Sequence, residues 1–364
     1  MLHSWSALFR PTIVPLARNA DVVKVKYNST LFCGPGQAQA HIVHFRSRSA
    51  LQGFERTKAE FQGGELRSGP IGPTKKFDVT EISDGEELAT MTIQWDTIGS
   101  YTSIIYERRG AIARILHNRP AQRNAENTKL LDEMDEAVRH AEADTDIRVI
   151  IIGATGDHFS AGHDLKEAMT ERRHYSVEQR WDYEEVKYYG YAMRLWDCAK
   201  PTIAQVQGAC VGGAFMVANM CDLVVASEDA YFTDPVLQSL ASAAVEVLVH
   251  PWVMGLRRAK EFLLTGEKMD AAEAYRIGMV NRVVPRGDLE AKTLELAQKI
   301  AGAPPFGARL TKRSLNRTAD IQGFRNSLSA HFDTHQITHV TAETWKIRDD
   351  GGASRAISAG KASA

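Results

Sequence analysis

Two consecutive glycines, Gly212 and Gly213, stand between an apolar run that starts at Thr202 and a second apolar run that ends before Asp222. The spacing predicts a strand, a glycine turn and then a helix, an arrangement that leaves backbone N–H groups unpaired at the helix N-terminus. Those N–H groups and the positive end of the helix dipole suit an anion or a developing oxyanion. The same glycines are also explained by close packing of a helix on a strand, and the pattern alone does not separate the two interpretations.

A second corner of the same kind is predicted in Gly156–Lys166. The small residues Ser160–Gly162 let the backbone pass close to a ligand, and Asp164 begins a helical turn, so the N–H of His163 is expected to point into a cleft. The imidazole of His163 suits acid–base chemistry. The alternative, which we favour at this point, is that the ring packs against a ligand or a neighbouring subunit and only its backbone matters.

The surrounding pattern predicts the elements that carry these corners. Ser103–Glu107 and Ala111–His117 are predicted as a hairpin around Gly110, and Asn127–Ala143 has the apolar spacing of an amphipathic helix. Arg148–Gly153 is a continuous apolar run, typical of a strand covered on both faces. Strand, helix and strand in this order indicate an α/β fold with a largely parallel sheet and right-handed crossovers.

Composition excludes several classes of protein. Of 364 residues, 44 are Lys or Arg and 45 are Asp or Glu, so no overall charge favours a nucleic acid or an acidic membrane as partner. No apolar run approaches the ~20 residues that span a bilayer. The four cysteines are scattered without a CxxC pair, which favours a reducing compartment and argues against disulfides and a metal site. We therefore expect a cytoplasmic protein.

Residues 1–100 differ from the rest and are expected to form an irregular or disordered extension, because no period of 2 or 3.6 persists there. Residues 1–20 are basic, lack acids and resemble an organelle transit peptide, which leaves a mitochondrial location open. The preferred interpretation is a natural start at Met91, with an over-extended reading frame before it.

Together, an ordered set of motifs resembles the enoyl-CoA hydratase/isomerase (crotonase) superfamily over Ile105–Trp345. The motifs are Asn118-Arg119-Pro120, Arg123-Asn124-Ala125, Phe159 to Lys166, Lys200 to Ala204, Gly208, Gly212-Gly213, Cys221-Asp222, Leu264 to Glu267, Ala271 to Ala274 and Gly278 to Asn281.

The resemblance implies a ClpP/crotonase-like spiral of ββα units over 101–286, a C-terminal helical trimerisation region over 287–348 and a flexible tail over 349–364. It implies a homotrimer or a dimer of trimers, and an acyl-CoA thioester whose CoA belongs to the substrate, with no other cofactor. It also implies that the backbone amides of His163 and Gly213 donate to the thioester oxygen. The residues implied to line the substrate site are Ala161, His163, Asp164, Leu165, Lys166, Gly212 and Gly213.

Two departures bear on the reaction. The positions that match the two glutamates of the family's hydratases hold Met216 and Val236, and neither side chain can transfer a proton, so water addition by the usual pair is excluded. Glu246, in the segment where the family has a glycine-rich loop, is the first candidate for a relocated acid or base. Asp234 is a weaker candidate, because Asp before Pro is common in turns, and His250 is expected to be structural.

For three further features the sequence leaves two interpretations open. The aromatic residues of Val177–Cys198 suit either an acyl pocket for a bulky or aromatic group or ordinary helix packing. The cations of Ala308–Arg317 either attract phosphates or form a solvated face. His331, His335 and His339 share one helix face, which suits a metal, but a surface or subunit contact is expected. The resemblance therefore implies an enolate-stabilising acyl-CoA enzyme that performs isomerisation, thioester hydrolysis or a C–C bond step, and the alternative hypothesis is an acyl-CoA-binding protein without catalysis.

Overall fold

The computed structural model describes residues 12–13, 23–29, 39–45 and 93–352, with side chains for 93–352. The chain divides into two compact units, residues 1–90 and 91–364. The helices predicted after residue 287 therefore belong to the same unit as the core. The expected tail beyond residue 352 and the predicted start at Met91 lie outside the described residues.

In the first unit, β1 (Thr12–Ile13), β2 (Val23–Ser29) and β3 (Gln39–Phe45) form an antiparallel sheet. The expectation of an irregular segment is wrong for these strands. The missed signal is the alternation of Val23, Val25 and Tyr27 with lysines in β2, which is the period of a strand.

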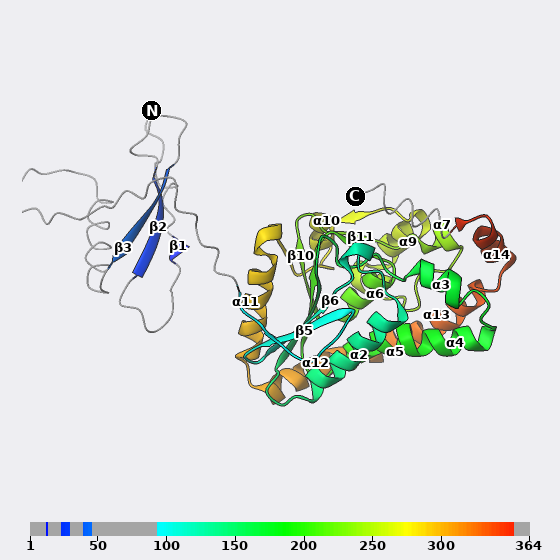
Figure 1. Ribbon diagram of the computed structural model, residues 1–364, viewed down its shortest axis with the longest axis horizontal. Coiled ribbons are helices and arrows are strands. Elements are labelled where there is room, and N and C mark those ends of the chain that lie inside the picture. Colours follow the sequence, from blue (N-terminus) through cyan, green and yellow to red (C-terminus); the bar gives the residue numbers. More distant parts are fainter. Residues whose placement is uncertain (1–11, 14–22, 30–38, 46–92, 353–364) are drawn as a thin grey trace, which may run out of the picture. The chain divides into compact units, whose positions relative to one another are not determined.

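The second unit is built on a seven-stranded sheet in the order β13-β10-β8-β7-β6-β5-β4. Figure 1 labels β5, β6 and β10 of this sheet. The five strands from β13 to β6 run parallel, and β5 and β4 are added antiparallel at one edge. The strands are β4 (Asp96–Thr97), β5 (Ile104–Arg109), β6 (Ile112–His117), β7 (Val149–Ala154), β8 (Thr202–Val206), β10 (Leu223–Ser227) and β13 (Arg282–Val284). The predicted hairpin and the predicted parallel sheet are therefore confirmed.

A small second sheet carries the glycine corner. It joins β9 (Ala209–Val211), β11 (Tyr231–Thr233) and β12 (Met269–Asp270), with β9 and β11 parallel. Three short 3-10 or π segments, η1 (Pro120–Gln122), η2 (Glu185–Tyr189) and η3 (Arg286–Asp288), connect elements of this unit. The helices are α2 (Thr128–Ala143), α3 (Leu165–Glu171), α4 (Val177–Glu184), α5 (Gly190–Asp197), α6 (Gly213–Met220), α7 (Val236–Leu240), α8 (His250–Met254), α9 (Leu256–Thr265), α10 (Ala271–Arg276), α11 (Leu289–Ala301), α12 (Pro305–Ile321), α13 (Phe324–Thr338) and α14 (Ala342–Asp349).

Apolar packing covers the large sheet on both faces. On one face α11 packs on Val149, Ile151 and neighbouring strand residues. On the other face α2, α5 and α6 pack on Ile150 and Ile152. The strand β7 is therefore buried on both sides, as its unbroken apolar run predicts. Within the described residues, no helix is both long and apolar enough to cross a bilayer.

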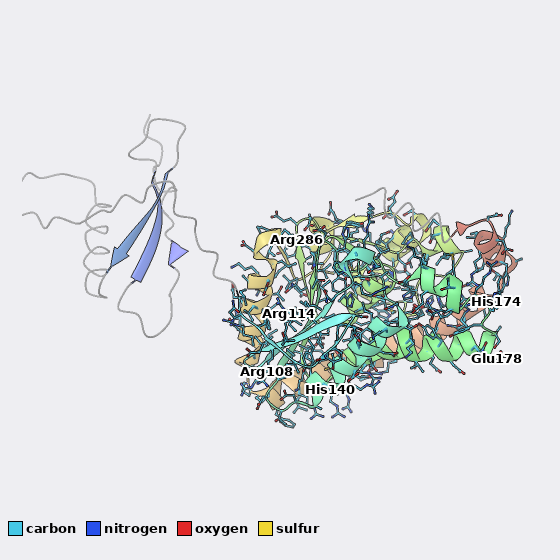
Figure 2. The ribbon with its side chains drawn as sticks, viewed as in Figure 1. Arg108, Arg114, His140, His174, Glu178 and Arg286 are labelled. Atoms are coloured by element: carbon cyan, nitrogen blue, oxygen red, sulfur yellow. The ribbon has the colours of Figure 1, made fainter. Side chains whose placement is uncertain are left out.

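The sequence pattern predicts that the folded core begins at Tyr101, but the second unit already contains ordered residues before it. Trp95 packs on the core beside α11, and its indole N–H donates to Glu290 at 2.7 Å. The guanidinium of Arg114, labelled in Figure 2, lies over the Trp95 ring at 4.1 Å from its centre. One aromatic side chain thus anchors the segment before the hairpin to the sheet.

Lys312 on α12 is buried, so the expected solvated basic face does not include it. Its ammonium forms an ion pair with Asp222 at 2.8 Å and donates to the carbonyls of Leu195 and Lys200, both at 3.2 Å. The neighbouring Arg309, Arg313 and Arg317 line, together with Lys312, a surface cavity of about 380 Å³. Asp222, which the sequence pattern marks as structural, also accepts from the Thr202 amide.

Candidate active site

The two predicted corners lie side by side. Ser160 is bridged to β9: its amide donates to the Ala209 carbonyl at 3.0 Å, and its carbonyl accepts from the Val211 amide at 3.1 Å. A methyl group added at Gly162 would come within 2.5 Å of the Val211 oxygen and 3.4 Å of the Gly213 nitrogen. Glycine is therefore required where the corners meet, and the Gly162 φ of 79° is one that favours it.

The backbone amides of His163 and Gly213, one at each corner, have no hydrogen-bond acceptor among the described residues. Gly213 is the first residue of α6, so its N–H has no acceptor one helical turn earlier. In the stretch from 93 to 352, neither the amide of His163 nor that of Gly213 donates a hydrogen bond. Two adjacent unpaired donors, one of them at a helix N-terminus, are suited to hold a polarised carbonyl oxygen.

The ring of His163 is held between two buried carboxylates. Its Nδ1 lies 3.3 Å from an oxygen of Glu126, and its Nε2 lies 3.0 Å from both oxygens of Glu246. The ring stacks on Tyr188 with centres 3.7 Å apart. Burial alone would lower the pKa of His163, but the carboxylates of Glu246 and Glu126 raise that pKa to about 10. His163 is thus an imidazolium at neutral pH, and its ring does more than pack against a ligand.

This pairing makes stability depend on alkaline pH. Because the folded pKa of His163 is raised from about 6.5 to about 10, the stabilising charge is complete below pH 6.5 and is lost as the pH rises towards 10. We expect the free energy of unfolding, measured by urea titration, to fall between pH 7 and pH 10, and the His163 ring to titrate near pH 10 by NMR. A ring that titrates near 6.5 would contradict the pairing.

Glu246 is the candidate acid or base that the structure brings to the site. Its side chain is buried and lines a cavity of about 130 Å³ together with His163. Burial would raise the pKa of Glu246, but the His163 charge lowers it, so the carboxylate is ionised at neutral pH. The apolar wall of the cavity is formed by Leu165, Ala168, Met169, Tyr188, Val236, Leu240, Ala244 and Val245.

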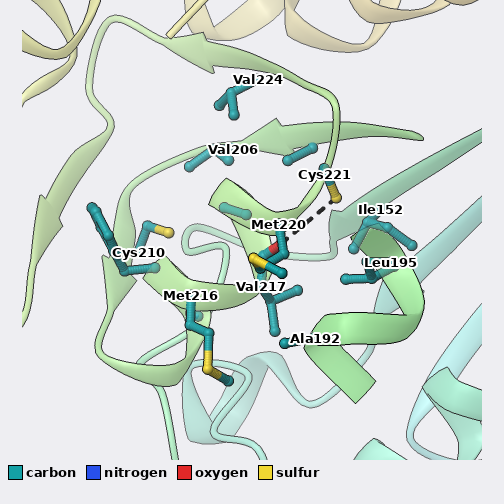
Figure 3. Close-up of a cluster of buried hydrophobic side chains, with 14 of the residues drawn as sticks. Ile152, Ala192, Leu195, Val206, Cys210, Met216, Val217, Met220, Cys221 and Val224 are labelled. Atoms are coloured by element: carbon teal, nitrogen blue, oxygen red, sulfur yellow. Dashed lines mark hydrogen bonds between the residues drawn. The ribbon is translucent and has the colours of Figure 1, made fainter. Parts of the chain in front are cut away.

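The two positions without glutamate have different surroundings. Val236 lies in the cavity wall, where its side chain is apolar. Met216 is fully buried on α6 and belongs to the large apolar cluster that also holds Cys210, Val217 and Met220, all labelled in Figure 3. A carboxylate in place of the Met216 side chain would have to be buried among these apolar groups. The apolar methionine therefore suits its surroundings.

Asp234 and His250 are not part of the cavity lining. Their side chains are fully buried, and His250 Nε2 lies 3.2 Å from an oxygen of Asp234. Asp234 accepts from the amides of Val236 and Val245, both at 3.4 Å, and the His250 ring stacks on Phe215. The pair joins the segment before α7 to α8, which is the structural role expected for His250.

The histidines of α13 are buried, so the expected surface face is wrong. His331 and His335 bond to the carbonyls of Val245 and Ala244, both at 2.8 Å, and so hold the loop that carries Glu246. His335 Nε2 also lies 3.7 Å from Glu246 and 3.4 Å from Glu184. Sequence spacing gave no sign of this, because the acids come from distant parts of the chain.

Glu184, His335 and His339 place three potential metal ligands within 4.8 Å of one another. The positions of the protons on these side chains favour a hydrogen-bonded cluster over a metal site. The Nδ1 of His339 accepts from Arg348 at 3.1 Å, so a neutral ring carries its proton on Nε2, which faces Glu184 at 3.1 Å. A metal on that Nε2 would require a histidine without any ring proton.

The remaining predicted binding residues divide into two groups. Leu165 lines the cavity, whereas Lys166 is exposed on the outside of α3. Asp164 caps α3 by accepting from the Lys166 amide at 3.1 Å, and it pairs with Arg119 at 3.0 Å. Ala161 donates its amide to the Arg123 carbonyl. Asp164 and Ala161 thus shape the corner that presents the His163 amide.

The aromatic residues before Cys198 mostly pack helices together. Trp181 and Tyr189 contact Phe332 of α13, and Trp196 stacks on Phe324. Tyr188, which stacks on His163, is the one of these residues that lines the cavity in the described part of the chain. The stripe therefore gives no support to a bulky or aromatic acyl group.

Comparison with known proteins shows which family this chain resembles in sequence and fold. A family model described as enoyl-CoA hydratase/isomerase matches residues 107–346. The chain is 42% identical over 294 residues to EchA13 of Mycobacterium tuberculosis, provisionally named an enoyl-CoA hydratase, covering 75% of this chain and 88% of that protein. It is 32% identical over 240 residues to 4-chlorobenzoyl coenzyme A dehalogenase-2 of an Arthrobacter species, covering 66% and 84%. The crystal structure of an enoyl-CoA hydratase/isomerase from Xanthobacter autotrophicus Py2 is 36% identical with a TM-score of 0.67, covering 71% and 97%.

The fold and the paired corners thus define a crotonase-type α/β protein, as the sequence motifs imply. The chain belongs to the enoyl-CoA hydratase/isomerase family and is an enzyme of that family.

Proposed function

We propose that the protein acts on an acyl-CoA thioester and stabilises the enolate formed from it, with the amides of His163 and Gly213 as the oxyanion hole. The observation that carries this proposal is the pair of unpaired amides at adjacent corners, next to a cavity that Glu246 lines. Loss of an α-proton moves an electron pair onto the thioester oxygen, and each donor aimed at that oxygen stabilises the transition state by about 3–4 kcal/mol.

Glu246 is the proposed proton acceptor. It is ionised, buried and fixed by His163, so it can take the α-proton without first losing one of its own. Return of that proton to a different carbon completes an isomerisation, and delivery of a solvent-derived proton to the same carbon is an exchange reaction. Water addition by the family's usual two glutamates is not proposed, because Met216 and Val236 occupy those positions.

The similarity to the chlorobenzoyl-CoA dehalogenase supports a reaction other than hydration, since that relative's name describes different chemistry on a CoA thioester. The competing function is an acyl-CoA-binding protein without catalysis. The homotrimer stays a prediction; α12 exposes Phe306, Leu310, Leu315 and Ile321, which a subunit contact would cover.

Exchange of the α-protons in D₂O separates the two functions. With 3-butenoyl-CoA and wild-type protein, we expect deuterium at the α-carbon by NMR, at a rate well above the same mixture without protein. The thioether analogue, which lacks the carbonyl oxygen, is expected to bind more weakly and not to exchange. Tight thioester binding with no exchange would favour the binding protein.

A further inference from the structure

The cavity has a cationic end that the proposed proton transfer does not use. A row of contacts runs from His163 through Glu246 and His335 to Glu184 and His339, and Arg348 of α14 contacts the last of these. Arg180 of α4 lies beside it, 3.5 Å from Glu184. Arg180, His339 and Arg348 all line the cavity. These groups lie at the opposite end of the contact row from the His163 corner.

Arg348 differs from the other arginines of the cavity. Arg172 pairs with Glu167 at 2.6 Å, Arg173 with Asp349 at 3.4 Å, and Arg180 with Glu184. Across the residues that the structure describes, Arg348 has no carboxylate within 4.0 Å.

The polar contact of Arg348 is the nitrogen of His339, and its guanidinium also lies 5.2 Å from the centre of the Trp345 ring. Burial lowers the pKa of His339 and keeps that ring neutral, so the only carboxylate that favours the Arg348 cation among the described residues is Glu184, which lies beyond 4.0 Å.

The Arg348 charge is disfavoured where it stands. Burial and the neighbouring Arg180 lower the pKa of Arg348 to about 10, and the attraction of Glu184 offsets only part of this effect. A half-buried guanidinium next to a second cation gains most from an anion, and a carboxylate can accept two hydrogen bonds from it in one plane. An amide or a methyl group in the same place would leave the charge unpaired.

We infer that the cavity takes an acyl group ending in a carboxylate, which Arg348 binds with the help of Arg180. This inference rests on the proposed function, because it assumes a thioester at the His163 and Gly213 amides. The cavity volume of about 130 Å³ limits the acyl group to a short one, since an apolar cavity of roughly 150 Å³ holds one benzene molecule.

Calorimetric titration with matched ligands tests the inference. Glutaryl-CoA carries the terminal carboxylate. The matched ligand is the derivative in which this carboxylate is replaced by an amide, which has the same shape without the charge. We expect wild-type protein to bind glutaryl-CoA about 10- to 100-fold more tightly than the amide, as for a hydrogen bond to a charged group. Arg348→Gln is expected to bind both ligands equally, and Arg348→Lys to keep part of the preference. Lys346→Gln removes a charge from an exposed position of the same helix. This control variant is expected to keep the full wild-type preference for glutaryl-CoA over the amide.

The outcomes separate the inference from the function. Equal binding of both ligands by wild-type protein, each tighter than free CoA, overturns the carboxylate site and leaves the thioester site standing. Binding of neither ligand beyond free CoA overturns both. A preference that survives in Arg348→Gln, with the variant folded by circular dichroism, also overturns the role of Arg348.

Discussion

Replacing Glu246 with glutamine is expected to slow α-proton exchange by about 100- to 10,000-fold, the usual contribution of a positioned general base. Glutamine keeps the shape of the side chain and a hydrogen bond to His163, but it cannot accept the α-proton. The rate constant is measured by NMR in D₂O with 3-butenoyl-CoA. Thioester affinity should change far less than the rate, because the amides of His163 and Gly213 remain in place.

A matched control is Glu171→Gln, which removes a carboxylate from an exposed position at the end of α3. That variant should exchange at the wild-type rate. The Glu246 variant also removes one of the two carboxylates that raise the His163 pKa, so the ring should titrate at a lower pH. An unchanged exchange rate together with a lowered His163 pKa would show that Glu246 only positions the ring.

Gly213→Ala is expected to lower kcat for the same exchange by about 100- to 1,000-fold, the range seen when one oxyanion donor is lost. The new methyl group would lie 2.3 Å from Cε1 of His163 and 2.6 Å from an oxygen of Glu126. Glu126 is buried and bonded to the His163 ring, so the ring or the first turn of α6 must move. Either movement shifts one of the two amides away from the carbonyl oxygen.

Gly287→Ala provides the comparison, because a methyl group there meets no atom within 4 Å. It should leave kcat and KM unchanged. An alanine at 213 that exchanges at the wild-type rate while its crystal structure shows a displaced His163 would mean that these amides do not hold the oxyanion.

Local patterns predicted the parts of the fold that local physics determines. The hairpin depends on Gly110 at a φ of 58°, and α2 starts at an Asn127 side chain that accepts from the Leu130 amide. The two corners were predicted because glycines and a helix start are visible within a few residues. Their meeting was implied by the family resemblance.

The groups that complete the site come from distant parts of the chain and left no local signal. Glu126 and Glu184 were not singled out, although they contact His163, His335 or His339, and Tyr188 was considered only as one of the aromatic residues of Val177–Cys198. Tyr188 lies in the π-helical segment Glu185–Tyr189, and side-chain periodicity cannot show such a turn in advance. The burial of the α13 histidines likewise depends on Glu184 and the Glu246 loop, which no short stretch of sequence brings together.

The row of alternating carboxylates and imidazoles has a consequence for how protons travel. Glu126, His163, Glu246, His335 and Glu184 follow one another at separations of 3.0 to 3.7 Å. The His335 to Glu246 separation of 3.7 Å is longer than a hydrogen bond, so a proton accepted by Glu246 passes along the row only when these two side chains move closer together. Loss of the abstracted proton from the site therefore depends on how often this one contact closes while the acyl group fills the cavity.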